Sequence, residues 1–84
     1  MSQAKVIFSL EGTEIIIDCS NEEKMRDICQ RYVTKIENNL ESLLFLYGEN
    51  PVNFELSFED QANSQDKLTN EMKVLVSKKK IMDS

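Results

Sequence analysis

The 84-residue chain contains no histidine and no tryptophan, and it has only one proline, two glycines and two cysteines. Without histidine, no mechanism that uses an imidazole as a base or a metal ligand is available. The scarcity of glycine and proline, together with 40% hydrophobic residues, excludes a collagen-like or low-complexity chain. A chain this short builds one small core with little room for a deep catalytic cavity. The composition therefore favours a binding module over an enzyme.

Positive charge is also scarce, because 15 acidic side chains stand against 10 basic ones and the net charge is -5. A negative chain repels phosphate backbones, so we expect no nucleic-acid partner. No stretch approaches the roughly 18 apolar residues of a membrane helix, and the N-terminus has no signal-peptide core. We therefore expect a cytoplasmic or nuclear protein that does not bind membranes.

The two cysteines, Cys19 and Cys29, form no C-x-x-C unit. A zinc site needs four ligands, which cannot be assembled here without histidine. In a reducing compartment we expect both thiols to be small buried apolar groups. Because no serine or cysteine has a base to activate it, we expect no catalytic residue, no metal and no cofactor.

Two runs of β-branched and aromatic residues near the start of the chain predict a β-hairpin. The runs are residues 5–10 and 13–18, and Gly12 supplies the positive φ of the turn between them. Strand alternation places Val6 and Phe8 on the inner face.

Ser20 and Glu23 have the spacing of a capping box, which predicts a helix that begins at Asn21. Its apolar residues recur at helical spacing and form one face that must lie against a sheet. On the solvated face, two pairs of opposite charge stand four residues apart: Glu22 with Arg26, and Asp27 with Arg31.

The second half of the chain predicts four further elements, joined by turns and one polar loop. They are a third strand at 43–47, an edge strand from Val52 and a helical turn within 56–62, followed by a polar loop at 63–70 and a last strand at 72–76. The order ββαββ predicts an α+β fold, with a mixed four- to five-stranded sheet packed on one main helix. The expected core is Val6, Phe8, Ile15, Ile17, Met25, Ile28, Tyr32, Phe45, Leu56, Val74 and Val76.

Four local features occur in a characteristic order. They are the turn Leu10-Glu11-Gly12-Thr13, the single capped helix, Phe45-Leu46-Tyr47 before a turn and Val52, and Leu56-Ser57 at the start of a helical turn. Together they resemble the ubiquitin-like, or β-grasp, family from Lys5 to Val76. Residues 43–52 can be laid without a gap on SUMO-type members, and Leu56-Ser57 is similar to the equivalent dipeptide of ubiquitin. The resemblance implies a ubiquitin-like β-grasp fold.

The resemblance also implies a protein-binding patch on the sheet, whose positions carry over to Leu10, Leu46 and Leu75, with Lys73 in place of ubiquitin's histidine. Strand alternation independently points Leu44, Leu46 and Leu75 away from the core. Several outward leucines form a larger apolar patch than scattered surface residues do, which favours a protein partner. The alternative is that a neighbouring domain or a second copy covers them.

We assign residues 1–4 to a disordered N-terminus, 5–76 to the ubiquitin-like domain and 77–84 to a flexible basic tail with Lys78, Lys79 and Lys80. The tail lacks the Gly-Gly end of conjugating family members. We therefore expect a non-conjugating interaction module, integral to a larger protein and monomeric as an isolated domain, whose partners are other proteins, including components of the ubiquitin pathway.

Two alternatives remain at this stage. One is a charge-driven β-grasp heterodimerisation module, which would use Lys5 or the acidic residues Glu55, Glu59, Asp60 and Asp66. The other is a free-standing ubiquitin-like modifier that is processed elsewhere.

Overall fold

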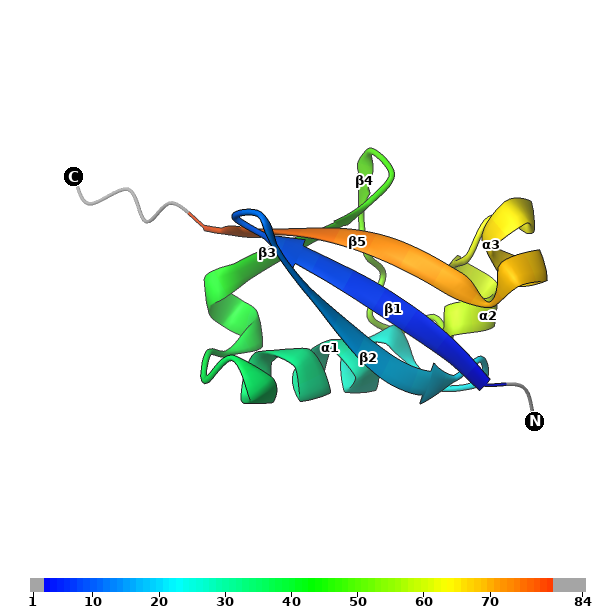
Figure 1. Ribbon diagram of the computed structural model, residues 1–84, viewed down its shortest axis with the longest axis horizontal. Helices are drawn as coiled ribbons and strands as arrows, with labels where there is room; N and C mark the ends of the chain where they lie inside the picture. Colours follow the sequence, from blue (N-terminus) through cyan, green and yellow to red (C-terminus); the bar gives the residue numbers. More distant parts are fainter. Residues whose placement is uncertain (1–2, 80–84) are drawn as a thin grey trace.

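A mixed five-stranded sheet curves around one main helix in the computed structural model, which describes residues 3–79 (Figure 1). The strands are β1 (Gln3–Leu10), β2 (Thr13–Ser20), β3 (Leu43–Tyr47), β4 (Asn50–Pro51) and β5 (Glu71–Lys78). The helices are α1 (Met25–Lys35), α2 (Phe58–Gln61) and α3 (Ser64–Thr69), with a 3-10 turn, η1 (Leu40–Ser42), before β3. The predicted α+β class with a mixed sheet is confirmed.

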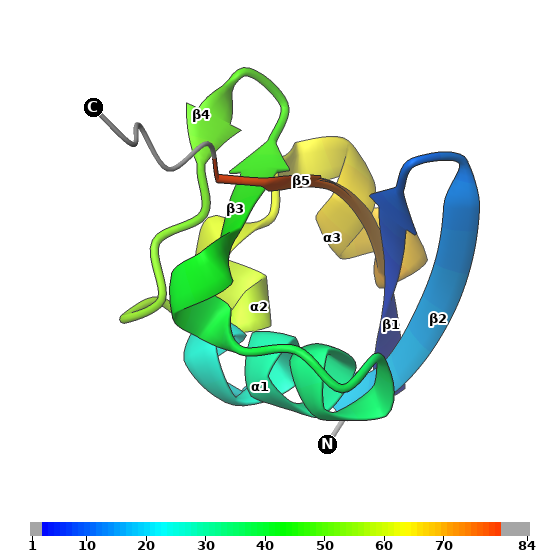
Figure 2. The ribbon, with the colours of Figure 1, turned by 90° about the vertical axis from the view of Figure 1, so that its left-hand side faces the viewer.

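The strands lie in the order β2-β1-β5-β3-β4. The central strands β1 and β5 are parallel, and every other neighbouring pair is antiparallel. All three α-helices lie on the inner side of the curved sheet (Figure 2). Within residues 3–79, the sheet therefore has one packed face and one face that no helix covers.

The β1–β2 hairpin turns through two residues, Glu11 and Gly12, whose φ angles are 51° and 86°. Positive φ at both positions gives the turn a twist that matches the right-handed twist of the strands. The register pairs Val6 with Ile17, as the alternation predicts.

The core lies between the sheet and α1, and three aromatic rings form its centre. The Phe8 ring stacks on Tyr32 with 4.3 Å between centroids, and Phe45 meets both rings edge-on. Of the predicted core residues, Ile15 and Leu56 are only half-buried. The interior is completed by the two cysteines, Cys19 and Cys29, and by buried residues outside the expected core list: Ala4, Val33, Leu43, Val52, Phe58, Ala62 and Met72.

Helix α1 begins at Met25, not at Asn21. The Ser20–Glu23 motif does form: the Ser20 N–H donates to Glu23 Oε1 at 3.2 Å, and the Glu22 N–H donates to Ser20 Oγ at 3.2 Å. These bonds close the turn between β2 and α1. The prediction of the helix start was wrong because a capping box also stabilises an isolated turn.

The two charge pairs predicted along α1 are also wrong, because their arginines reach other parts of the chain. Arg26 pairs with Glu55 at 2.7 Å. Arg31 pairs with Glu23 and donates to the Asp18 carbonyl. Both arginines therefore connect α1 to neighbouring segments instead of stabilising the helix alone.

Residues 63–70, which we expected to form a polar loop, contain helix α3. The Asn63 side chain caps it by accepting from the Asp66 N–H at 2.8 Å. The Tyr47 hydroxyl donates to the Asp66 carboxylate and accepts from the Asn63 N–H at 2.9 Å. This helix is held by polar contacts with β3, so it has no apolar stripe to reveal it in the sequence.

The short edge strand β4 ends at Pro51 and does not begin at Val52 as predicted. Val52 instead follows the strand, where its N–H donates to the Phe45 carbonyl at 2.9 Å and its side chain is buried. Pro51 lies on the outermost strand, where its missing N–H costs no ladder bond.

The regular structure extends beyond the predicted domain limits at both ends. Residues 3–4, which we assigned to a disordered N-terminus, lie in β1, and Ala4 is buried. Residues 77–78, assigned to the tail, lie in β5. Lys79, also assigned to the tail, donates its N–H to the Ser42 carbonyl at 3.0 Å, and residues 1–2 and 80–84 fall outside the described residues. Among residues 3–79, no helix is long and apolar enough to span a membrane.

Candidate protein-interaction surfaces

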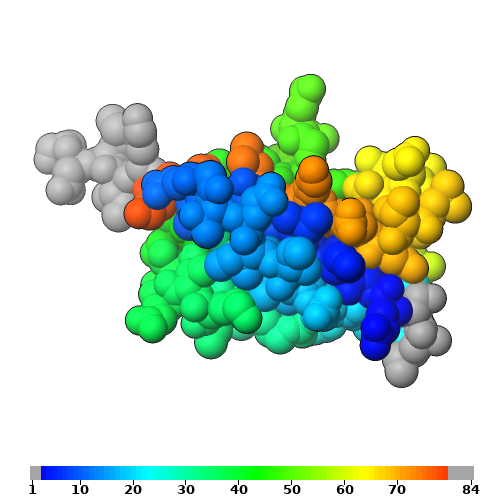
Figure 3. Space-filling model, viewed as in Figure 1, coloured from blue at the N-terminus to red at the C-terminus, as the bar shows by residue number. Residues whose placement is uncertain are grey.

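The uncovered side of the sheet carries a group of aliphatic side chains, which we call the outer face. Alternation from the buried residues Val6, Phe45 and Val74 fixes which side chains point outward. The resulting outer face contains Ile7, Ile16, Leu44, Leu46, Lys73 and Leu75. In Figure 3, strands β1, β2 and β5 form a continuous surface on the side turned to the viewer.

Strand register brings the outer-face side chains together from separate parts of the sequence. Ile7 lies beside Ile16 on one side and Lys73 on the other. Leu75 is the direct partner of Leu46. Ile16 and Leu75 are 54% and 55% exposed, and Leu44 is 38% exposed. The outer face therefore carries two aliphatic pairs, Ile7 with Ile16 and Leu46 with Leu75, and the residues between them are Ser9 and Lys73.

Four of the five predicted patch residues lie on the outer face, and Leu10 does not. Leu10 has the same strand parity as Phe8, is paired with the buried Val76, and packs against the core. Its assignment to the patch was wrong, because strand alternation turns its side chain to the same side of β1 as Phe8.

Ile7 and Ile16 belong to the outer face but were not predicted. The alternation that turned Val6 and Ile17 inward also turns Ile7 and Ile16 outward, so the sequence contained the necessary signal.

Lys73 places a positive charge within the outer face, and Lys5 lies two residues before Ile7 on the same side of β1. Lys73 is exposed and flanked by Ile7, and no carboxylate of the described residues lies within ion-pair distance of its ammonium group. A shallow depression of about 260 Å³ lies beside it, lined by Ser9, Glu14, Leu46, Gly48, Lys73, Val74 and Leu75. A partner bound here meets the apolar side chains of Leu46 and Leu75 together with one ammonium group, of Lys73, and one carboxylate, of Glu14.

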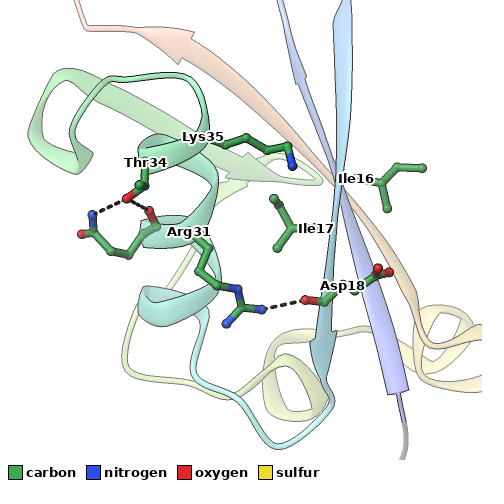
Figure 4. A pocket seen from close by; sticks show the side chains of 7 residues that line it. Ile16, Ile17, Asp18, Arg31, Thr34 and Lys35 are labelled. Carbon is green, nitrogen blue, oxygen red and sulfur yellow. Dashed lines mark hydrogen bonds between the residues drawn. The ribbon is translucent and has the colours of Figure 1, made fainter.

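A second surface is a groove of about 510 Å³ between β2 and α1, which we call the edge groove (Figure 4). Ile17 points into it from β2, while Lys35 extends across it from α1. Its full lining is Ile16, Ile17, Asp18, Gln30, Arg31, Thr34 and Lys35. The groove thus combines an apolar wall with two cationic side chains.

The edge groove runs along an open sheet edge, because β2 is the outermost strand. Leu10 and Thr13 flank the two-residue turn and form a hydrogen-bonded pair. Along an antiparallel ladder, such pairs alternate with pairs whose backbone groups point away from each other. The backbone groups that point away from β1 therefore belong to Glu14, Ile16, Asp18 and Ser20. Such a row of groups can pair with another extended chain.

One end of this edge is occupied by the ion pair between Glu23 and Arg31. Arg31 Nη2 donates to the Asp18 carbonyl at 2.7 Å, and Glu23 Oε1 accepts from the Ser20 N–H at 3.2 Å. The hydrogen bond from Arg31 lowers the pKa of the Glu23 carboxyl below its usual value. Glu23 is therefore ionised throughout the neutral pH range.

Both cysteines lie in the core, as the sequence predicts. Burial raises the pKa of Cys19 to about 11 and that of Cys29 to about 12. Their thiols are therefore protonated at neutral pH and are weak nucleophiles. Among residues 3–79, no group of three or more potential ligands is placed to hold a metal ion.

No protein-family model matches this chain, and no curated protein matches it.

Proposed function

We propose that this chain is a ubiquitin-like β-grasp domain that binds other proteins through its outer face. The observation that carries the proposal is the exposure of Ile16 and Leu75 on a sheet face that no helix in the described part of the chain covers. The fold assignment is supported by the strand order, in which parallel first and last strands lie at the centre beside one main helix. In this proposal the domain is a non-conjugating, monomeric module of a larger cytoplasmic or nuclear protein, without catalytic residue, metal or cofactor.

The outer face suits a transient partner better than a permanent one. Burying one aliphatic side chain contributes about 1.5–3 kcal/mol, and lost translational and rotational freedom offsets part of the total. Three such residues support a dissociation constant in about the micromolar range or weaker. Lys73 adds a preference for a partner with a carboxylate placed among apolar side chains.

The test is a binding measurement with matched leucine variants. A partner recovered with the intact chain is titrated against isotope-labelled wild type, Leu75→Asp and Leu68→Asp. Leu68 is the control because it is 84% exposed but lies on α3, outside the outer face. We expect Leu75→Asp to abolish binding without loss of fold and Leu68→Asp to bind normally. Chemical-shift changes confined to α1 around Arg26 and Gln30 would contradict the proposal.

A second candidate function is the addition of an extended partner segment to β2. It is favoured by one observation, the open backbone edge that runs along the edge groove. A segment with alternating apolar residues can bond to the backbone of Ile16 and place every second side chain beside Ile17. This binding mode is independent of Leu75.

The charge-driven heterodimer has less support. Of the acidic residues it requires, Glu55 is paired with Arg26, and Asp66 is bonded to the Tyr47 hydroxyl. Salt dependence separates the modes, because charge docking weakens steeply with salt and apolar docking does not.

A further inference from the structure

We infer that the Glu23–Arg31 pair is an autoinhibitory contact that closes the Ser20 end of the β2 edge to an added strand. The inference rests on the second candidate function, strand addition at the edge groove.

At the Ser20 end, the outward backbone groups already have partners. The Ser20 N–H donates to Glu23 Oε1, and the Ser20 carbonyl accepts from the Glu23 N–H at 3.0 Å. The Asp18 carbonyl accepts from Arg31 Nη2. A new strand cannot bond to these groups unless the Glu23 and Arg31 contacts break.

At the other end, the outward groups of Glu14 and Ile16 face no strand among the described residues. The Lys35 side chain extends across the edge groove there but forms no hydrogen bond or ion pair with a described residue, so an arriving segment displaces it without breaking such a contact. Extension past Ile16 towards Ser20 then meets Arg31, which also lines the edge groove. The edge is thus divided into an open half and a closed half.

In the closed half, the Glu23 and Arg31 side chains supply the hydrogen-bond acceptor and donor that a neighbouring strand would supply to β2. A carboxylate accepts where a neighbouring strand would present a carbonyl, and a guanidinium donates where it would present an N–H. Glu23 lies in the turn before α1 and Arg31 lies on α1, so both reach the edge from the same side. Their mutual ion pair holds them in this position.

The pair can open at modest cost, because the side chains of Arg31 and Glu23 are 44% and 24% exposed. Partly exposed ion pairs change an equilibrium constant by up to about fivefold. The contact is therefore strong enough to bias binding and weak enough to be displaced by a segment that forms more backbone bonds.

A peptide of the chain's own residues 3–10 is a suitable probe, since this sequence pairs with β2 in the native sheet. In the same antiparallel register at the open edge, its lysine lies beside Asp18 and its isoleucine beside Ile16. Binding is followed by chemical-shift titration of the full chain as wild type, Arg31→Ala and Arg26→Ala. Arg26→Ala is the matched control, because it removes another exposed α1 ion pair, with Glu55, away from β2.

We expect the peptide to bind Arg31→Ala about two- to fivefold more tightly than wild type or Arg26→Ala, with shifts that extend from Ile16 to Ser20. Equal affinities for Arg31→Ala and Arg26→Ala would overturn the inference while leaving strand addition intact. Failure of the peptide to bind any variant would overturn both, and would leave the Leu75→Asp test of the outer face unaffected.

Amide exchange supplies a second readout that needs no ligand. We expect Glu23→Ala to speed exchange of the Ser20 amide severalfold, with little change at core amides such as Phe8. An unchanged Ser20 rate would show that the contact does not protect the edge in solution, and the inference would fail.

Discussion

The hydroxyl of Tyr47 connects β3 to the start of α3, and its removal in Tyr47→Phe tests how that helix is held. The hydroxyl donates to the Asp66 carboxylate and accepts from the Asn63 N–H. Burial, reinforced by the Asp66 carboxylate, raises the pKa of Tyr47, so the donor is present at neutral pH. Phenylalanine keeps the ring and removes both hydrogen bonds.

The magnitude follows from the two bonds that are lost. A hydrogen bond to a charged group contributes about 1.5–3 kcal/mol to the free energy of unfolding, and a neutral one about 0.5–1.5 kcal/mol. Asp66 is half-buried and Asn63 is exposed, so water replaces part of both interactions. We therefore expect a loss of about 1.5–3 kcal/mol, which lowers Tm by at least about 6 °C in a domain of this size.

The only other tyrosine provides the control. The hydroxyl of Tyr32 forms no hydrogen bond with a described residue, so Tyr32→Phe should change stability by less than about 0.5 kcal/mol. Thermal melts give Tm, and amide exchange at Asp66 and Lys67 reports on α3 alone. Equal Tm values for the two variants, with unchanged exchange in α3, would refute the assigned role of Tyr47.

Two further predictions concern the core and the acid response. Ile28→Ala should lower the free energy of unfolding by about 2–5 kcal/mol, because Ile28 is fully buried on the sheet-facing side of α1. A Tm within a degree of that of the exposed control, Gln30→Ala, would contradict this orientation of the helix. The pKa of Glu23 is lower in the folded chain than its usual 4.5, so its contribution to stability is complete above that value and is lost as pH falls through the folded pKa. Urea midpoints should accordingly fall more for wild type than for Glu23→Gln between about pH 6 and about pH 3, and parallel curves would contradict this.

The sequence predicted the elements whose burial gives a periodic pattern. The hairpin, the inward face of α1 and the outward leucines of β3 and β5 all follow from alternation or helical spacing, because one side of each element must leave water. For the same reason the sequence could have added Ile7 and Ile16 to the outer face and excluded Leu10.

The remaining features depend on contacts between distant residues, which a local pattern does not contain. Helix α3 is held by Tyr47, which lies 16 residues before the Asn63 cap. The start of α1 is set by Leu56, whose carbonyl accepts from the Met25 N–H at 2.8 Å. The partners of Arg26 and Arg31 likewise come from other segments, so i,i+4 spacing alone misassigned them.

The parallel pairing of β1 with β5 also determines how the domain bears a mechanical load. The ladder runs from Lys5–Glu71 to Leu10–Val76, and the start of β1 and the end of β5 lie at opposite ends of the molecule (Figure 1). Tension applied at Gln3 and Lys78 therefore pulls the two strands past each other along their length. All bonds of the ladder share that force in shear, whereas tension across the open end of the β1–β2 hairpin would separate its pairs one after another.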